Sequence, residues 1–433
     1  MLFNNNKVKG YKKDDVYGIC RDLPLNYIKR QEVDKKLIGN LNKSRHIVIY
    51  GSSKQGKTSL KKSCLKSDEY INIQCLNHWK LTDIHLAILK KAGYQTTQSV
   101  KQTASGKQKV AASFEGIVNF FGLAGSKGTI SADTEQQKTT ETLLENFDVD
   151  PDDVNDIIAC LNAIKFQKYI VLEDFHYLDI DIQRDFAVVL KAFHEASKFC
   201  FIIIGVWLEE NRLIVYNGDL TGRVIAVDAD KWTSRELMQV IDEGAKLLNI
   251  NFTEHFKTTV IKESYGSVYI VQEVCSQACD QEQVKETQSQ FRTIGGGLDV
   301  HNLIKSVVNQ QNGRYMSFIH QFSEGFQDTR LEMYKWILYS ILTVGLKELQ
   351  QGLTYARIRE ELQSRHPQGK NLNPGNLTQA LQSTSSLQVK KGIKPIIIDY
   401  DQTNRRLNVV DRGFLIWLAN QNIPELLATF EYN

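Results

Sequence analysis

Short apolar runs alternate with amphipathic segments over the first half of the chain. Segments with apolar positions three and four residues apart predict helices, at 31–41, 57–66, 81–91, 152–165 and 181–198. Uninterrupted, often β-branched runs predict strands buried on both faces, at 45–50, 70–75, 169–172, 199–206 and 223–227. Strands that alternate with helices favour a mainly parallel, doubly wound sheet.

One segment inside this alternating pattern differs in composition. Residues 95–147 are rich in Gln, Thr, Ser, Lys and Gly and have poor periodicity, apart from the apolar stretch Phe114–Phe121. We expect an insertion, a mobile hairpin in form. Asp150 and Pro151 follow it and predict a cap and a first-turn proline for the next helix.

The second half of the chain changes character twice. Thr233-Ser-Arg-Glu236 is a capping box, and from there to about residue 345 the pattern is almost all helical. Three helices then follow at Leu331–Glu348, Tyr355–Arg365 and Pro374–Thr384, before a hairpin formed by 396–400 and 406–410. Three helices followed by a hairpin is the order of a winged-helix domain.

Composition narrows the classes of protein but does not select one. The chain has 433 residues and a net charge of +3, which predicts several domains and no overall polycation. The seven cysteines form no CxxC pair, and no apolar segment has the ~20 residues that cross a bilayer. With no apolar signal core near Met1, we expect a cytoplasmic protein with reduced thiols and no membrane contact.

The segment after the first predicted strand carries the clearest chemical motif. Gly51-Ser-Ser-Lys-Gln-Gly-Lys57-Thr58 fits G-x-x-x-x-G-K-[ST], with a strand before it and a helix after it. Successive backbone N–H groups and a helix N-terminus form a cradle for phosphate. Lys57 then reaches the outer phosphates and Thr58 is a ligand of Mg²⁺. The cofactor-binding set predicted here is Gly51, Ser52, Ser53, Lys54, Gln55, Gly56, Lys57, Thr58 and Ser59.

Two acids stand at the end of a later apolar strand, as phosphoryl transfer requires. Tyr169-Ile-Val-Leu is followed by Glu173 and Asp174. The first acid is expected to support Mg²⁺ and the second to orient or activate the attacking water. The order Glu then Asp is the reverse of the commoner one, so the two roles overlap. ATP and Mg²⁺ are therefore the expected cofactors.

With both motifs placed, the chain resembles the AAA+ ATPases and their STAND relatives, and among them initiator-type proteins with a winged helix. The resemblance covers about residues 20–420. The run 23–32 is similar to the family's adenine-side motif, which implies that Tyr27 and Ile28 pack on the base, with plain packing as the alternative. Gly222-Arg223 is similar to a segment whose arginine reaches a neighbouring subunit's γ-phosphate. The alternatives for Arg223 are an intrasubunit phosphate contact or a surface salt bridge.

The resemblance implies four parts and one fold class. These are an N-terminal segment with the adenine-side motif (1–30), a P-loop ATPase core with the 95–147 insertion (31–230), a helical lid and connector (231–330) and a winged-helix domain (331–433). The fold class is an α/β P-loop NTPase core with a doubly wound parallel sheet, followed by a helical lid and an α+β winged-helix domain.

Two departures from the family pattern argue against fast hydrolysis. The strand 199–206 leads into Gly205-Val206-Trp207 and lacks a polar sensor at its tip, a role that Glu209 or Asn211 would have to fill. The lid has Tyr265-Gly-Ser-Val268 where many relatives carry an arginine. Both departures suit a slow nucleotide-dependent switch better than a processive motor.

The C-terminal segment has a local positive charge. Residues 354–412 contain ten Lys or Arg and five Asp or Glu, which gives a local charge of about +5. The cluster around the predicted wing consists of Lys390, Lys391, Lys394, Arg405 and Arg406. Polar side chains on the candidate recognition helix are Asn376, Thr378, Gln379 and Gln382, with no Lys or Arg among the residues of that helix. DNA contact and a partner-facing role both stay open.

Two classes of function follow from these features. The first is a slow ATPase switch, forming nucleotide-dependent homo-oligomers, that couples nucleotide state to a winged helix contacting DNA or a partner effector. The catalytic residues would be Lys57, Glu173, Asp174 and Arg223. The second is a non-hydrolysing nucleotide-gated module or a DNA-binding regulator, in a bacterial defence system for example.

Overall fold

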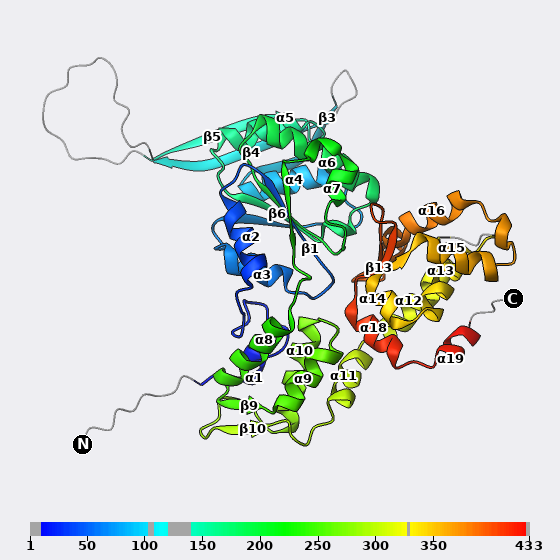
Figure 1. Ribbon diagram of the computed structural model, residues 1–433. Coiled ribbons are helices and arrows are strands. Elements are labelled where there is room, and N and C mark those ends of the chain that lie inside the picture. Colours follow the sequence, from blue (N-terminus) through cyan, green and yellow to red (C-terminus); the bar gives the residue numbers. More distant parts are fainter. Residues whose placement is uncertain (1–9, 103–107, 120–139, 327–329, 430–433) are drawn as a thin grey trace, which may run out of the picture.

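The protein is described from a computed structural model, which covers residues 10–102, 108–119, 140–326 and 330–429 (Figure 1). Its largest sheet is parallel and five-stranded, with the order β2-β6-β7-β1-β8. Its strands are β1 (His46–Tyr50), β2 (Tyr70–Gln74), β6 (Tyr169–Glu173), β7 (Phe201–Ile204) and β8 (Val224–Asp228). The predicted doubly wound P-loop sheet is confirmed.

Helices cover both faces of this sheet because side chains alternate along each strand. In β1, Ile47 and Ile49 pack with one group of helices, while Val48 and Tyr50 pack with the other. The first group is α2 (Gln31–Leu41) and α3 (Lys57–Cys64). The second is α4 (Leu81–Ala92), α5 (Val154–Ala163) and α6 (Ile180–Ala196), and the short α7 (Arg212–Tyr216) packs on α6.

The insertion forms more regular structure than its composition suggests. Its described parts are three antiparallel strands, β3 (Gln95–Gln102), β4 (Gln108–Asn119) and β5 (Thr140–Val149), while 103–107 and 120–139 lie outside the described residues. The predicted cap of α5 is wrong: Asp153 caps the helix by accepting from the Asn155 N–H, and Pro151 lies in the turn before it. Asp150 instead accepts from the Asp152 N–H in that turn.

A helical lid follows the sheet. It contains α8 (Ser234–Leu247), α9 (Glu254–Glu263), α10 (Val268–Gln281) and α11 (Val300–Asn309), with β9 (Ile250–Phe252) paired to β10 (Arg292–Ile294). Thr233 caps α8 in the predicted capping box with Glu236. Near the N-terminus, α1 (Lys13–Val16) leads to Tyr17, whose hydroxyl donates to the Ile241 carbonyl, so this segment packs on the lid.

The C-terminal module (330–429) has the predicted three helices and hairpin, with additions. Its elements are α13 (Met333–Thr343), α14 (Leu346–Gln351), β11 (Leu353–Thr354), α15 (Tyr355–Arg365), α16 (Pro374–Gln382), α17 (Thr384–Lys390), β12 (Ile398–Asp401), β13 (Arg406–Val409), α18 (Arg412–Ala419) and α19 (Ile423–Ala428). The antiparallel sheet has the order β11-β13-β12. The single helix predicted over 331–348 is wrong, because Val344 takes an extended conformation before Gly345 and separates α13 from α14.

One apolar core joins the lid to the C-terminal module. It includes Ile270 and Val307 from the lid and Ile337 and Phe414 from the module, with α12 (Asn312–Glu324) between them. In Figure 1 the sheet, the lid and the C-terminal module surround a central region where the carboxyl end of β1 lies. None of the described helices combines the length and the apolar character that crossing a membrane requires.

Candidate nucleotide-binding site

The phosphate loop connects β1 to α3, and two glycines give it its shape. Gly51 has φ +145°, and a Cβ there would lie 2.9 Å from the backbone nitrogen of Asp230. Gly56 has φ +78° and stands at the N-cap of α3. Both conformations favour glycine, so the loop can direct its amides toward a ligand at the helix N-terminus.

Lys57 lies folded against this loop. Its Nζ donates to the Gly51 carbonyl at 3.0 Å and to the Ser52 carbonyl at 2.6 Å. Burial lowers the pKa of Lys57 to about 8, while the negative charges of Asp230 and Asp174 act in the opposite direction. A buried ammonium with carbonyl partners gains from an anion placed beside it.

The two acids at the end of β6 have different surroundings. Glu173 forms an ion pair with Lys61 of α3, whose Nζ also donates to the Asn72 side chain at 2.7 Å. Asp174 has φ +56°, accepts from the Gln74 amide and lines the same pocket as Lys57 and Thr58. Burial raises the pKa of Asp174, and the negative charge of Glu173 raises it further. Asp174 is therefore the acid that faces the phosphate loop.

A pocket of about 430 Å³ extends from the loop to the lid. Tyr27 and Ile28 line it, together with Val268 and Tyr269 of the lid. The Tyr27 hydroxyl donates to Asp34 at 2.7 Å, which fixes the ring. The structure thus brings the predicted adenine-side residues and the phosphate loop together in one pocket.

Contacts that the sequence motif does not predict tie the loop to the lid. The Gln55 amide donates to the Gly266 carbonyl at 3.2 Å and accepts from the Val268 N–H at 3.3 Å. Trp232 donates from Nε1 to the Gln55 carbonyl at 3.3 Å. Lys54 places its ammonium 3.8 Å from the ring centre of Tyr269. A variable position in the motif, Gln55, therefore links the loop to the start of α10.

The C-terminal module also reaches the phosphate loop. The Ser53 N–H donates to the Val410 carbonyl at 2.8 Å. Asp230 accepts from the Ser52 N–H at 2.9 Å and forms an ion pair with Arg412, which begins α18. Arg412 also donates to the Tyr265 carbonyl at 3.0 Å. An arginine from the C-terminal module thus touches the lid turn in which the sequence lacks one.

A buried polar cluster joins the same module to the core. Arg212 donates to Asp399 at 2.5 Å and lies 3.4 Å from Glu209. Glu209 accepts from the Thr403 N–H at 3.2 Å and from its hydroxyl at 2.6 Å. Burial raises the pKa of both Glu209 and Asp399. The hypothesis that Glu209 fills the sensor position is wrong, because its two oxygens are held by Arg212 and Thr403.

Arg223 lies at the opposite end of the sheet from the phosphate loop. It precedes β8, and its carbonyl accepts from the N–H of His46 at the start of β1. Its guanidinium donates to Glu195 at 2.9 Å and to the Asp219 carbonyl. Of the three roles considered, the intrasubunit phosphate contact is wrong and the surface salt bridge is present.

The basic residues of the wing are engaged within the chain. Lys391 pairs with Glu324 at 3.0 Å, and Arg406 donates to the Gly352 carbonyl at 2.9 Å. Lys390, Lys394 and Arg405 lie over the rings of Phe326, Tyr177 and Tyr355. Lys394 is also near enough to Asp174 to lower the pKa of that acid. This wing faces the core as well as solvent.

Comparison with known proteins supports the fold. No family model and no curated protein matches the chain. Among solved structures, the Walker-type ATPase PABY2304 of Pyrococcus abyssi is similar with a TM-score of 0.53 at 13% identity, over 91% of this chain and 96% of that one. Orc1 of Aeropyrum pernix in complex with DNA reaches 0.41 at 10% identity (94% and 98%), and Cdc6p of Pyrobaculum aerophilum 0.36 at 13% (95% and 96%). The last two scores are too low to carry an argument. The chain has the fold of a Walker-type P-loop ATPase.

Proposed function

We propose that this chain binds ATP with Mg²⁺ and is a slow ATPase switch in which nucleotide state controls the position of the C-terminal module. One observation carries the proposal: the Val410 carbonyl accepts a hydrogen bond from Ser53 in the phosphate loop. A module that contacts the loop itself is sensitive to what the loop holds.

The residues of the pocket fit ATP. The loop amides, Lys57 and Thr58 would hold the phosphates and the metal, and Tyr27 and Ile28 would pack on the base. Mg²⁺ bound with the nucleotide neutralises charge that develops on the transferred phosphoryl group. Asp174, which lines the same pocket as Lys57, would orient a water, and Glu173 would support the metal on release from Lys61.

Hydrolysis is expected to be slow for two structural reasons. The residue beyond the tip of β7 that enters the core is Trp207, which is fully buried in an apolar cluster with the Arg212 guanidinium over its ring. The lid turn at Tyr265 has no arginine that could contact a phosphate, and its backbone carbonyl accepts a hydrogen bond from Arg412. Full turnover would then depend on Arg223 of a second copy, in a nucleotide-dependent homo-oligomer.

The switch follows from competition at the loop. A carbonyl oxygen carries partial negative charge, so Val410 beside Ser53 and a γ-phosphate on the same loop disfavour each other. Arg412 reinforces the contact through Asp230. Nucleotide binding would therefore shift the population toward the state in which the module is released. The size of this shift is set by the difference in nucleotide affinity between the bound and released states.

The released module would contact DNA or a partner protein, as a STAND-like arrangement implies. Lys390, Lys391, Lys394, Arg405 and Arg406 would lose their internal partners or change them on release. Salt-dependent binding of a DNA duplex to the ATP-bound protein would support DNA as the ligand of the released module, because phosphate contacts weaken as salt rises. Absence of such binding would leave a partner protein as the ligand.

A non-hydrolysing, nucleotide-gated module is the second candidate, favoured by the sensor-free tip of β7. Phosphate release by the purified protein separates the two, with Lys57→Ala and Asp174→Ala as controls. Turnover that is lost in both variants supports the ATPase switch. Turnover no higher than the Lys57→Ala background would leave the non-hydrolysing module. Molecular size measured with and without Mg·ATP tests Arg223, since an unchanged monomer would remove its role in a neighbouring site.

A further inference from the structure

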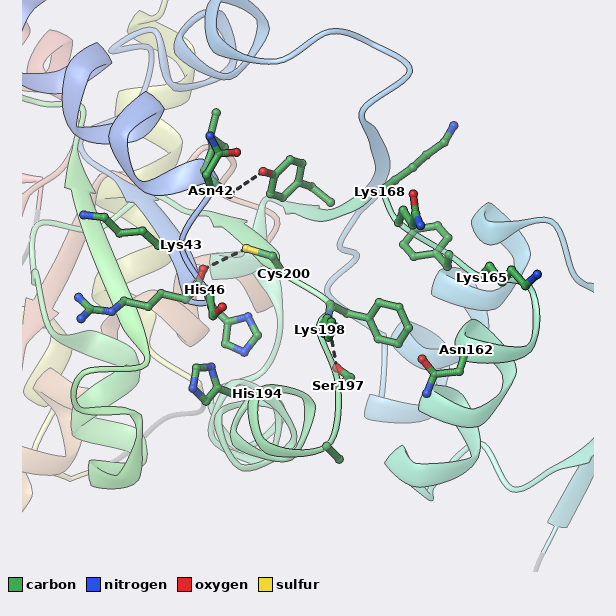
Figure 2. Close-up of a pocket in the computed structure, with 18 residues that line it drawn as sticks. Asn42, Lys43, His46, Asn162, Lys165, Lys168, His194, Ser197, Lys198 and Cys200 are labelled. Atoms are coloured by element: carbon green, nitrogen blue, oxygen red, sulfur yellow. Dashed lines mark hydrogen bonds between the residues drawn. The ribbon is translucent and has the colours of Figure 1, made fainter.

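A second cavity lies at the end of the sheet remote from the phosphate loop. Its volume is about 970 Å³, more than twice the 430 Å³ of the nucleotide pocket. It is formed by the loops that lead into β1, β6 and β7, with the ends of α5 and α6 beside them (Figure 2). We refer to it as the basic cleft.

Positive charge dominates the lining of the basic cleft. Five exposed cations line it, and no Asp or Glu is among its lining residues. They are Lys43, Arg45, Lys165, Lys168 and Lys198. In Figure 2, Lys43 stands on one rim and Lys165 and Lys168 stand on the other. Since the net charge of the whole chain is +3, this is a local concentration of charge.

These cations differ from Arg223 and Lys391 in having no acidic partner among the described residues. Arg223 is paired with Glu195, and Lys391 is paired with Glu324. Within the part of the chain that the structure describes, none of the five cleft side chains forms an ion pair. Their charge is therefore available to a ligand from outside.

The lining of the cleft also includes aromatic and neutral polar groups. Phe166 is half-buried and packs edge-on against Phe199, with 5.9 Å between ring centres. The Tyr169 hydroxyl donates to the Leu41 carbonyl at 2.6 Å. Burial lowers the pKa of His46 to about 4, so that ring is neutral at neutral pH. Fixed positive charge thus comes from lysine and arginine.

We propose that the basic cleft binds single-stranded nucleic acid through its phosphodiester backbone. Long, exposed side chains on two rims suit an extended polyanion, whereas sites for small ligands are enclosed and mostly apolar. A half-buried aromatic ring, Phe166 in the same loop as Lys165 and Lys168, offers a stacking surface to an unpaired base, which a duplex keeps inside its stack. The site is separate from the wing and from the nucleotide pocket, and it does not depend on hydrolysis.

The test is a fluorescence-anisotropy titration of the full-length protein with a labelled single-stranded DNA of about 20 nucleotides. The cleft variant is Lys165→Gln/Lys168→Gln/Lys198→Gln. The control variant, with the same change in charge, is Lys246→Gln/Lys262→Gln/Lys305→Gln, three exposed lysines of the lid helices. Each phosphate contact releases condensed counterions, which contributes about 0.6 log unit of binding affinity at about 0.15 M salt. The cleft variant loses three such contacts and should therefore bind about 50-fold more weakly.

The salt dependence of binding and a substitution of the Phe166 ring provide two independent readouts. Losing three contacts should reduce the slope of log affinity against log salt by roughly 2. Phe166→Leu should weaken single-strand binding by about fivefold or more and leave duplex binding unchanged. Absence of single-strand binding, or equal losses in the cleft and lid variants, would overturn the proposal. Loss confined to Lys390→Gln/Lys391→Gln would also overturn it, by placing the contact on the wing.

Discussion

Lys57 shows how a single buried charge sets the conditions for ligand binding. Its ammonium is held by the carbonyls of Gly51 and Ser52, and desolvation lowers its pKa to about 8. The polyphosphate of ATP would favour the charged form and raise that pKa again. Proton uptake and nucleotide binding are therefore coupled at this residue.

ATP affinity should accordingly depend on pH in one direction. Below about pH 8 Lys57 is already protonated, so affinity is constant with respect to this group. Above that value free protein loses the proton, and affinity falls roughly tenfold per pH unit up to the pKa of the complex. Calorimetric titration with Mg·ATP between pH 7.5 and 9.5 measures this. The Lys57→Arg variant, whose side chain stays charged, should bind ATP with an affinity that does not change with pH. A pH-independent ATP affinity in the unmodified protein would contradict the role assigned to Lys57.

At this scale the sequence predicted the motif residues but not their tertiary partners. Lys57, Thr58 and Asp174 come together in one pocket as the motif spacing requires. Asp230 and Arg412 contact each other across 182 positions in sequence, and no local pattern marks such a pair. The wrong hypothesis for Glu209 has the same origin, because its partner Thr403 lies 194 positions away.

The elements of the C-terminal module show what local pattern can and cannot predict. The helix at 374 begins where Asn373 and Pro374 place it, since the Asn373 side chain accepts from the Gly375 N–H. The adjoining α17 was not predicted, because the pattern ended the helix at Thr384 and no Gly or Pro beside Ser383 marks the start of a second one. Gln388 fixes α17 instead: its amide donates to the Ile398 carbonyl at 2.8 Å and accepts from the Ile397 N–H at 2.7 Å.

Gln388→Ala should destabilise the C-terminal module. Removing the buried amide leaves backbone groups of Ile397 and Ile398 without partners, which costs about 2–4 kcal/mol for two such groups. Urea denaturation followed by circular dichroism measures the loss. Gln379→Ala, on the exposed side of α16, should stay within about 0.5 kcal/mol. Equal stability of the two variants would show that Gln388 does not hold α17 to β12.

For the whole molecule, the important feature is the contact between the core and the C-terminal module. It combines the Arg212 cluster, the apolar group Val206, Val389, Ile396 and Val410, and the contact at Ser53. The sequence predicted both parts but not this contact, because Arg212 and Asp399 look like surface charges until the two parts meet. Here the buried arginine stabilises one relative position of the parts.

Arg212→Ala should weaken this contact and strengthen ATP binding. The substitution leaves Asp399 buried without its cation, and breaking such a pair costs about 3–5 kcal/mol. If nucleotide and module compete, the affinity for Mg·ATP should rise by about tenfold or more. Arg184→Ala, which removes an exposed pair with Asp181, is the control and should leave affinity unchanged. Unchanged affinity in Arg212→Ala would argue that the loop and the module act independently.

Hydrogen exchange at the Thr403 amide tests the proposed competition most directly. This N–H donates to Glu209 of the core, whereas the neighbouring Asn404 N–H donates to Asp401 within the module. Release of the module by saturating Mg·ATP should accelerate exchange at Thr403, leave Asn404 unchanged and have no effect in Lys57→Ala. A Thr403 amide that stays equally protected while ATP is bound would contradict a switch that works by releasing the C-terminal module.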